Sequence, residues 1–313
     1  MAMHVVVGSG PVGSAVARLL LERGEQVRVV TRSGTGPEGA ERVRADAADA
    51  PRMIALTQGA TALYNCVNPP YDRWAADWPP VAAGLLGAAE SSGAVRATTS
   101  NLYVYGPVDG PMTEDLHLVA LGTKGRVRAQ MWRDALGAHE AGRVRAFEVR
   151  GSDYIGAPGS SLVSMLMLPA WRKGRTAWLA ANLDVPHSWT DVEDVATLLV
   201  AGVQDARAWG RPWHVPTAAP RTMRELAALA GKRAQTPAGV RSLPQAAVWA
   251  AGVADPFVRE LREAQHQFRR PFVLDSSPAQ QTFGLEPTAT EVAVGREVDE
   301  FARTHAEAAG ALH

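Results

Sequence analysis

The stretch His4-Val-Val-Val-Gly-Ser-Gly-Pro-Val-Gly13 combines an apolar run, a glycine-rich turn and the start of a helix. Three consecutive valines are typical of a strand buried on both faces of a parallel sheet. Helical spacing of apolar residues continues over Ser14–Arg23, and a second strand is predicted at Gln26–Thr31. The pattern G-x-G-x-x-G permits a tight turn, close approach of the backbone to a pyrophosphate and close helix–strand packing. We therefore predict a dinucleotide-binding unit rather than a glycine-rich turn without a ligand.

The helix that starts in this stretch would direct its unpaired N–H groups toward the phosphates of the cofactor. Pro11 suits the first helical turn, because the N–H that proline lacks would be unpaired there. We assign the pyrophosphate to the residues of the turn, which are Gly8, Gly10, Pro11, Val12 and Gly13.

The end of the second strand indicates which dinucleotide binds. An NAD site usually places Asp or Glu there, about 20 residues after the turn, to bind the ribose 2′-hydroxyl. This chain has no acid between Gln26 and Pro37, and the strand ends in Thr31-Arg32-Ser33. Arg32 would pair with a 2′-phosphate, helped by Thr31 or Ser33. We favour NADP over NAD, and the alternative for Arg32 is a solvated surface arginine.

Composition excludes several classes of protein. The chain has 313 residues, of which 46% are hydrophobic and 20% charged, and its formal net charge is zero. Neither a nucleic acid nor an anionic membrane is therefore expected as a partner. The longest apolar run, Leu162–Leu168, is too short to span a bilayer. Because the chain starts directly in a strand, we expect no signal peptide.

The single cysteine, Cys66, excludes an intrachain disulfide and fits a reducing cytoplasm. The histidines show no spacing typical of metal ligands, so no metal is predicted. We expect a cytoplasmic monomer or homodimer that acts on a small-molecule substrate.

Strands and helices alternate along the first half of the chain. Further strands are expected at Arg42–Asp46, Ala62–Val67, Val95–Ser100 and Arg143–Val149, and further helices at Ala47–Gln58, Trp78–Ser91 and Thr123–His139. This alternation predicts an α/β fold with a Rossmann-like, doubly wound parallel sheet. The ligand of such a sheet lies at the carboxyl ends of its strands.

Two segments lie at this predicted edge. The loop Asn65-Cys-Val-Asn-Pro-Pro70 follows the fourth strand, and we assign Cys66, Val67 and Asn68 to the cofactor site. Asp46 follows the third strand, where it either lies near the adenine or caps the next helix.

The pattern changes beyond Gly156, where proline, tryptophan and short helices dominate. We predict a cofactor-binding domain of residues 1–156, to which 186–210 returns, and a smaller, mostly α-helical substrate domain of 157–185 and 211–313. Its tryptophans either line an apolar substrate pocket or belong to the core. They are Trp171, Trp178, Trp189, Trp209, Trp213 and Trp249.

Several segments together resemble the extended, epimerase-like branch of the short-chain dehydrogenase/reductase superfamily. They are the Gly8–Gly13 turn, Ser100-Asn-Leu-Tyr-Val-Tyr-Gly-Pro107, Lys124, Arg150–Gly156, His187-Ser-Trp-Thr-Asp-Val-Glu-Asp-Val-Ala196 and Trp213-His-Val-Pro216. The resemblance covers nearly the whole chain and implies an NAD(P)-dependent oxidoreductase. It also implies that Lys124 holds the nicotinamide ribose.

The catalytic pattern of that family, Tyr-x-x-x-Lys, is incomplete in this chain. The residue four before Lys124 is Ala120, so the tyrosine that would exchange a proton with the substrate is missing at this spacing. The family's serine position falls on Asn101, with Ser100 beside it. We therefore predict an atypical active site with a non-standard proton donor.

Three hypotheses follow. In the first, the chain is an NADP-dependent reductase of a small or medium apolar molecule of specialised metabolism, and Tyr103 donates the proton. Tyr105 matches a structural tyrosine, and for both residues the alternative is a packing role with a bonded hydroxyl. In the second, the substrate is an enone or an iminium ion, and Asn101, Ser100 and Lys124 only position and polarise it. In the third, the chain is a non-catalytic NADP-binding regulator that senses redox state.

For further polar residues, a structural role is the alternative to a role in the site. His187 and Asp153 are candidates for the cleft, and the alternatives are a surface histidine and a helix cap. Asp191, Glu193 and Asp194 are predicted to be charges that favour a helix N-terminus, not a catalytic carboxylate pair.

Overall fold

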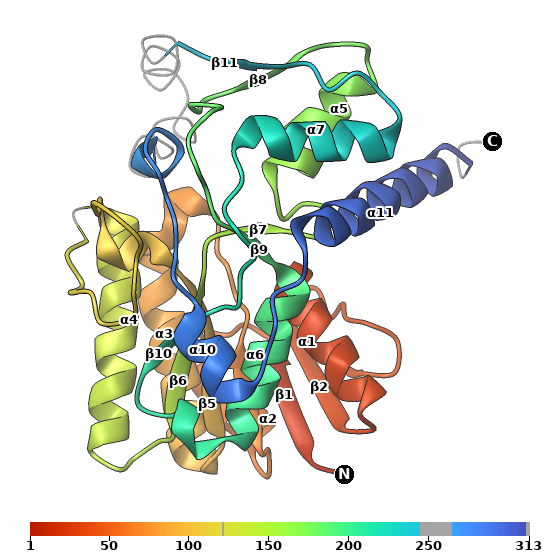
Figure 1. The fold of residues 1–313 in the computed structure, drawn as a ribbon. Helices are drawn as coiled ribbons and strands as arrows, with labels where there is room; N and C mark the ends of the chain where they lie inside the picture. The colour runs from red at the N-terminus through yellow and green to blue at the C-terminus, as the bar shows by residue number, and fades with distance from the viewer. Residues whose placement is uncertain (121, 245–264, 311–313) are drawn as a thin grey trace.

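The computed structural model describes residues 1–120, 122–244 and 265–310. Its largest element is a seven-stranded sheet in which all neighbouring strands are parallel, with the order β10-β6-β5-β4-β1-β2-β3 (Figure 1). The strands are β1 (Met3–Val7), β2 (Gln26–Thr31), β3 (Glu41–Arg44), β4 (Ala62–Asn65), β5 (Val95–Asn101), β6 (Ala146–Gly151) and β10 (Pro212–His214). The order reverses between β1 and β4, so the glycine-rich turn after β1 lies at the topological switch point where such sheets bind ligands.

Helices cover both faces of the sheet. One face is covered by α1 (Pro11–Glu22) and α6 (Val192–Gln204), and the other by α2 (Ala50–Thr57), α3 (Trp74–Ser92) and α4 (Thr123–Glu140). The valines of β1 alternate between the two layers, with Val6 in the first and Val5 and Val7 in the second. All three are at most 2% exposed, as expected of a central strand. The predicted doubly wound α/β fold is confirmed.

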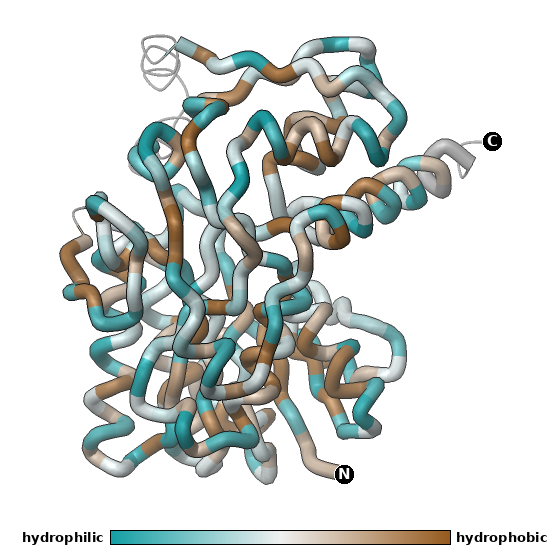
Figure 2. Tube along the Cα trace, viewed as in Figure 1, coloured by the Kyte–Doolittle hydropathy of each residue, from teal (hydrophilic) through white to brown (hydrophobic). Residues whose placement is uncertain are grey.

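A second region lies beyond the carboxyl ends of the strands (Figure 1). It contains α5 (Leu168–Trp171), α7 (Met223–Ala234), α11 (Thr290–Gly310), a π-helical turn (Val163–Met167) and the paired strands β8 (Ala177–Leu179) and β11 (Val240–Ser242). Its core is separate from those of the sheet. Figure 2 shows hydrophobic and hydrophilic residues alternating along α11, which packs against α7. Within the described ranges, every helix is too short or too polar to cross a membrane.

The two regions are joined by a short parallel strand pair, β7 (Asp153–Ile155) and β9 (Trp189–Asp191). The chain returns to the sheet at β10, and again at α10 (Ser277–Phe283), which places Ala279 in the core of the sheet. Both returns lie beyond the 186–210 segment that the sequence assigns to the first domain. The division into two domains therefore stays a prediction with this refinement.

Several predicted bounds differ from the observed ones. The third strand ends at Arg44 and the fourth at Asn65, each two residues early. The helix α2 begins at Ala50 because Asp49, and not Asp46, caps it by accepting the Arg52 N–H at 3.1 Å. The cap alternative for Asp46 is wrong, since its carboxylate accepts the N–H of residue 48 in the preceding turn.

The helix α3 begins four residues before the predicted start. Trp74 and Trp78 are at most 1% exposed, and Arg73 and Asp77 form an ion pair across the first turn. These contacts hold a helical turn ahead of the proline pair 79–80, which therefore lies inside the helix and not at its start.

Candidate active site

The glycine-rich turn between β1 and α1 has no space for larger side chains at two of its glycines. Gly8 has a φ of +95°, and a Cβ atom there would lie 2.6 Å from the carbonyl oxygen of Cys66. A Cβ atom at Gly13 would collide with the carbonyl of Gly8, so this glycine lets the helix approach the strand. At Gly10, by contrast, no described atom lies within 4 Å of the Cβ position. Open space thus remains at the N-terminus of α1, which begins with Pro11 as predicted.

The end of β2 lies beside this turn. Thr31 Oγ1 accepts the N–H of Thr35 at 2.9 Å and donates to its carbonyl oxygen at 3.0 Å, and Ser33 Oγ lies 2.8 Å from Thr35 Oγ1. Ser9 of the glycine-rich turn reaches the same hydroxyl at 3.5 Å. Thr31 and Ser33 thus shape the loop, while Arg32 is exposed at this edge.

The loop after β4 borders the glycine-rich turn on the other side. Thr99 donates a hydrogen bond to the Cys66 thiol, and burial raises the pKa of that thiol to about 12. The thiol is therefore protonated and unreactive at neutral pH. Asn65 accepts the N–H of Val67 at 3.3 Å, and Asn68 is exposed.

Two tyrosine hydroxyls meet at the carboxyl ends of β4 and β5. Tyr71 opens a 3-10 turn after β4, Tyr103 lies in a 3-10 turn after β5, and their Oη atoms are 2.8 Å apart. Both rings pack against Trp74, with centroid distances of 5.1 and 6.1 Å. Asn101 accepts the Tyr103 N–H at 3.2 Å and thereby caps the second turn. The pair is thus held by both local and tertiary contacts.

Lys124 lies beside this tyrosine pair at the start of α4. Its Nζ is 5.5 Å from the ring centroid of Tyr71, and the residue is 1% exposed. Gly125 allows α4 to start this close, because a Cβ atom there would collide with the Tyr103 carbonyl oxygen and with Ala120. The structure therefore brings the predicted residues Lys124 and Tyr103 together and adds Tyr71.

An acid–histidine pair, with a buried histidine and a partly exposed acid, lies close to the tyrosines. Asp153 Oδ2 is 2.7 Å from His187 Nε2, and His187 Nδ1 is 3.2 Å from the carbonyl oxygen of Gln267. The parallel pairing of β7 with β9 holds the two side chains together. His187 is 3% exposed and Asp153 27%. The alternatives of a surface histidine and a helix cap are therefore wrong.

The charge of Asp153 acts on the tyrosine pair. Burial raises the pKa of Tyr103 well above its ordinary value, and the charges of Tyr71 and Asp153 add to this effect. Burial also raises the pKa of Tyr71, and Asp153 adds to it, while the hydrogen bond with Tyr103 lowers it. Both hydroxyls therefore stay protonated at neutral pH, and because one of them donates to the other, the second can donate a hydrogen bond to a substrate oxygen.

Residues 4–215 match the model of the NAD dependent epimerase/dehydratase family. The chain belongs to this family. The match extends from β1 to β10, so it includes the glycine-rich turn, the tyrosine pair, Lys124 and the Asp153–His187 pair, but not Gln267. The resemblance to extended short-chain dehydrogenases is confirmed, and with it an enzyme of that type. No curated protein matches the chain.

Solved structures share the fold over nearly the whole chain. MoeE5 in complex with UDP-glucose and NAD has a TM-score of 0.80 at 18% identity, covering 97% of this chain and 100% of its own. The dTDP-glucose 4,6-dehydratase of Bacillus anthracis, in complex with NAD, has a TM-score of 0.80 at 14% identity and 98% coverage of both chains. The UDP-glucuronic acid 4-epimerase of Bacillus cereus, also with NAD, has a TM-score of 0.79 at 14% identity, covering 97% and 100%.

The residues present fit the nicotinamide dinucleotide of this family. The space at Gly10 faces the free N–H groups of α1, as a pyrophosphate requires. Asn65 Nδ2 and Ser100 Oγ are buried without a hydrogen-bond partner in the part of the chain that the structure describes. Such atoms cost stability unless a ligand satisfies them. Asn65 ends β4, which pairs with β1, and Ser100 lies one residue before the end of β5, the next strand of the sheet.

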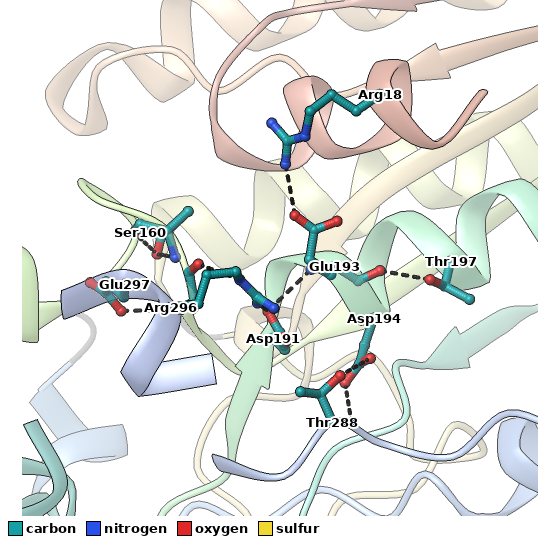
Figure 3. Close-up of polar contacts among 11 residues, drawn as sticks. Arg18, Ser160, Asp191, Glu193, Asp194, Thr197, Thr288, Arg296 and Glu297 are labelled. Atoms are coloured by element: carbon teal, nitrogen blue, oxygen red, sulfur yellow. Dashed lines mark hydrogen bonds and ion pairs between the residues drawn. The ribbon is translucent and has the colours of Figure 1, made fainter. Parts of the chain in front are cut away.

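The acids at the start of α6 bind structural partners (Figure 3). Asp191 caps the helix by accepting the N–H of Glu193 at 3.2 Å, and it pairs with Arg296 of α11. Glu193 pairs with Arg18 of α1 at 2.7 Å, and Asp194 bonds the loop before α11. The interpretation of these acids as N-terminal charges of a helix is confirmed. Among the described residues, no group of three metal-ligating side chains could hold a metal ion.

The tryptophans do not line one pocket. Trp171 and Trp189 belong to the core of the second region, and Trp209 and Trp213 pack in the core of the sheet. Trp178 is 49% exposed and borders a cavity of about 570 Å³, which the tyrosine pair does not line. The charged residues of its wall are Asp184, Arg224, Arg241 and Arg269. Trp249 lies outside the described residues.

Sequence analysis missed two residues of the site. Tyr71 directly follows the prolines of the loop after the fourth strand, and this position at the predicted cofactor edge is the signal that would have found it. Gln267 bonds Tyr103 through its side chain and His187 through its carbonyl. No local pattern marks Gln267, because both contacts are tertiary.

Proposed function

We propose that this chain is an NADP-dependent reductase that transfers a hydride to a small or medium apolar carbonyl, enone or imine substrate. The observation that carries the proposal is the Tyr71–Tyr103 hydroxyl pair beside the buried Lys124. These groups lie at the same sheet edge as the glycine-rich turn. Carbonyl reduction places negative charge on the substrate oxygen, and fixed hydrogen-bond donors and a cation stabilise that charge.

The proposed cofactor contacts follow the sheet edge. The glycine-rich turn and the N-terminus of α1 hold the pyrophosphate, Lys124 holds the nicotinamide ribose, and Arg32 pairs with the 2′-phosphate. When bound, the cofactor supplies the hydride. The solved structures named above contain NAD, so the preference for NADP rests on Arg32 and on the lack of an acid between Gln26 and Pro37.

Protonated tyrosines at the site support the reductive direction. Reduction needs a protonated hydroxyl, whereas oxidation of an alcohol needs a base. Because burial and Asp153 raise the pKa of both Tyr71 and Tyr103, the hydroxyls are in the form that reduction uses. This favours a reductase over a dehydrogenase at neutral pH.

The substrate class follows from what the site lacks. Epimerisation or dehydration of a nucleotide sugar, such as the UDP-glucose bound to MoeE5, usually needs the family's tyrosine to form a keto intermediate. Here that position is Ala120. We therefore propose simple reduction, in which Ser100, Asn101 and Lys124 position and polarise a substrate that includes the enones and imines named above.

Cofactor titration tests the proposal. Tryptophan fluorescence would measure the affinity of wild type and Arg32→Ala for NADPH and NADH, with the exposed Arg52→Ala as the matched control. A charged hydrogen bond contributes about 1.5–3 kcal/mol, so Arg32→Ala should weaken NADPH binding about ten- to a hundredfold and leave NADH binding unchanged. Equal affinity of the wild type for the two cofactors would contradict the assignment of Arg32.

A second function, a non-catalytic NADP-binding regulator, is favoured by one observation: Ala120 stands at the family's tyrosine position. A panel of ketones, enones and imines separates the two functions. The regulator would bind NADPH tightly and oxidise it with none of them, whereas the reductase would consume NADPH with at least one class.

A further inference from the structure

We propose that Tyr71 is the proton donor of this reductase and replaces, from a distant part of the chain, the tyrosine that the family places four residues before its lysine. The inference rests on the proposed reduction. Its basis is spatial: Tyr71 meets the buried Lys124 at 5.5 Å and the Tyr103 hydroxyl at 2.8 Å. A tyrosine–lysine pair thus exists in the fold although the sequence motif does not.

The Tyr71 side chain is held in place before any substrate binds. The turn that carries it is fixed by a hydrogen bond from Trp74 Nε1 to the carbonyl oxygen of Pro69 at 3.0 Å. The Tyr71 ring packs against the Trp74 ring, and Arg128 lies 4.8 Å from the centroid of that same indole. A donor fixed in this way loses little freedom when the reaction occurs.

Within the hydroxyl pair, Tyr71 is the residue whose ring contacts Lys124. The shared hydrogen bond lowers the pKa of Tyr71 and raises that of Tyr103, and the charge of Arg128 further lowers the pKa of Tyr71. Once Tyr71 has lost its proton, the Tyr103 hydroxyl donates to the phenolate oxygen. Tyr103 is therefore a positioning residue that stabilises the ionised form of Tyr71.

The charged and titratable groups around Tyr71 come from three elements. The charge of Arg128 in α4 and the hydroxyl of Tyr103 favour its ionised form, and Lys124 of α4 lies 5.5 Å from the centroid of its ring. Asp153 of β7 and burial oppose ionisation, so Tyr71 keeps its proton until a stronger base is formed. The alkoxide that develops during carbonyl reduction is such a base.

In the proposed step, the carbonyl carbon receives a hydride and the carbonyl oxygen receives a proton. As the carbonyl carbon gains the hydride, the electron pair of the C=O π bond moves to the oxygen, which takes the proton of Tyr71. The O–H bond of the tyrosine breaks, the O–H bond of the alcohol forms, and NADPH leaves as NADP⁺. Tyr71 then recovers a proton from solvent, which completes the cycle.

The first experiment is Tyr71→Phe, with Tyr64→Phe as the matched control. Tyr64 is a buried tyrosine whose hydroxyl lies 3.3 Å from His4 in the core. Removal of a general acid should lower kcat about 10²- to 10⁴-fold, while NADPH affinity and the circular dichroism spectrum stay those of the wild type. Tyr64→Phe should keep the wild-type kcat.

The second experiment measures the pH dependence of kcat, which a purely structural role of Tyr71 would not change. Site-specific 3,5-difluorotyrosine, a more acidic phenol, at position 71 should shift the alkaline fall of kcat to lower pH. The same replacement of Tyr103 acts on Tyr71 only through their hydrogen bond and should shift that fall less. A shift only at Tyr103, or a wild-type kcat in Tyr71→Phe, would overturn this inference and leave the reductase intact. A wild type that oxidises NADPH with no carbonyl, enone or imine would instead overturn the proposed function, and this inference with it.

Discussion

Tyr103 and Tyr105 lie two residues apart in the same 3-10 turn, yet their hydroxyls enter different environments. The Tyr105 hydroxyl accepts from Arg150 Nη1 at 2.7 Å and lies 2.8 Å from His214 Nε2. The Tyr103 hydroxyl meets Tyr71 and Gln267, close to the partly exposed Asp153. One hydroxyl is thus saturated by buried structural partners, and the other belongs to a group with ionisable neighbours.

Two buried histidines extend this comparison. His214 Nδ1 donates to the carbonyl oxygen of Asp275 at 2.8 Å, so its Nε2 is free to accept the proton of Tyr105. A single neutral imidazole satisfies both contacts. His187 also has a carbonyl at Nδ1, but its Nε2 faces the carboxylate of Asp153, which only accepts when ionised. One neutral form of His214 satisfies the first network, whereas both ring nitrogens of His187 face oxygen atoms of the protein.

The largest contrast is expected from Tyr103→Phe and Tyr105→Phe. Without the Tyr103 hydroxyl, the ionised form of Tyr71 loses a hydrogen bond worth about 1.5–3 kcal/mol, so kcat should fall about ten- to a hundredfold with little change in stability. Without the Tyr105 hydroxyl, buried groups of Arg150 and His214 lose a partner, which should lower the free energy of unfolding by about 1–3 kcal/mol. Steady-state kinetics and urea unfolding measure the two effects.

The reverse result would break the comparison. If Tyr105→Phe lowered kcat while Tyr103→Phe only lowered stability, the network of Tyr105, and not that of Tyr103, would take part in the reaction. A double variant adds a check, because residues in separate networks should have additive effects on the two measurements.

The part of the site that depends on local spacing was predictable. The glycines of the Gly8–Gly13 turn and the buried strand before them follow from a short segment, because each position is fixed by its own element. Lys124, near the start of a helix, followed from the resemblance to the family. The position of Tyr71 directly after the loop of the fourth strand is also a local signal, but its pairing with Tyr103 was not predictable in this way. Its partner hydroxyl lies 32 residues away in sequence, and only the neighbouring positions of β4 and β5 in the sheet bring the two together.

The same distinction explains the acid–histidine pair. Asp153 and His187 were each identified as polar residues at plausible places, but they are 34 residues apart. Their contact depends on the register of β7 against β9, strands of three residues each that carry no periodicity of their own. Sequence patterns therefore give the residues at the edge, and the sheet pairing gives their partners.

A smaller effect is expected from Asp153→Asn. Removal of this charge should lower the pKa of Tyr71 and Tyr103, because the carboxylate adds to the rise in both. The rate of the reverse reaction, alcohol oxidation with NADP⁺, requires the ionised donor, so its alkaline rise should move to lower pH. The control is Asp205→Asn, which removes an exposed partner of Arg207. If the alkaline rise in the oxidation rate of Asp153→Asn stayed at its wild-type pH, the charge of Asp153 would not act on the tyrosine pair.

The smallest effect concerns the pH dependence of stability that His214, in the network of Tyr105, contributes. Burial lowers the pKa of His214 to about 4 from the ordinary value of 6.5. Between these values the unfolded chain takes up a proton that the folded chain does not, so this group lowers stability as the pH falls from 6.5 toward 4, by up to about 1.4 kcal/mol per pH unit. His214→Asn should be less stable than the wild type at pH 7 but should lose this part of the slope, so urea unfolding should show the two curves approaching at acidic pH. The exposed His117→Asn should keep the wild-type slope. Parallel curves for the wild type and His214→Asn would mean that the folded protein accommodates a charged His214. The Tyr105 network would then not depend on a neutral imidazole.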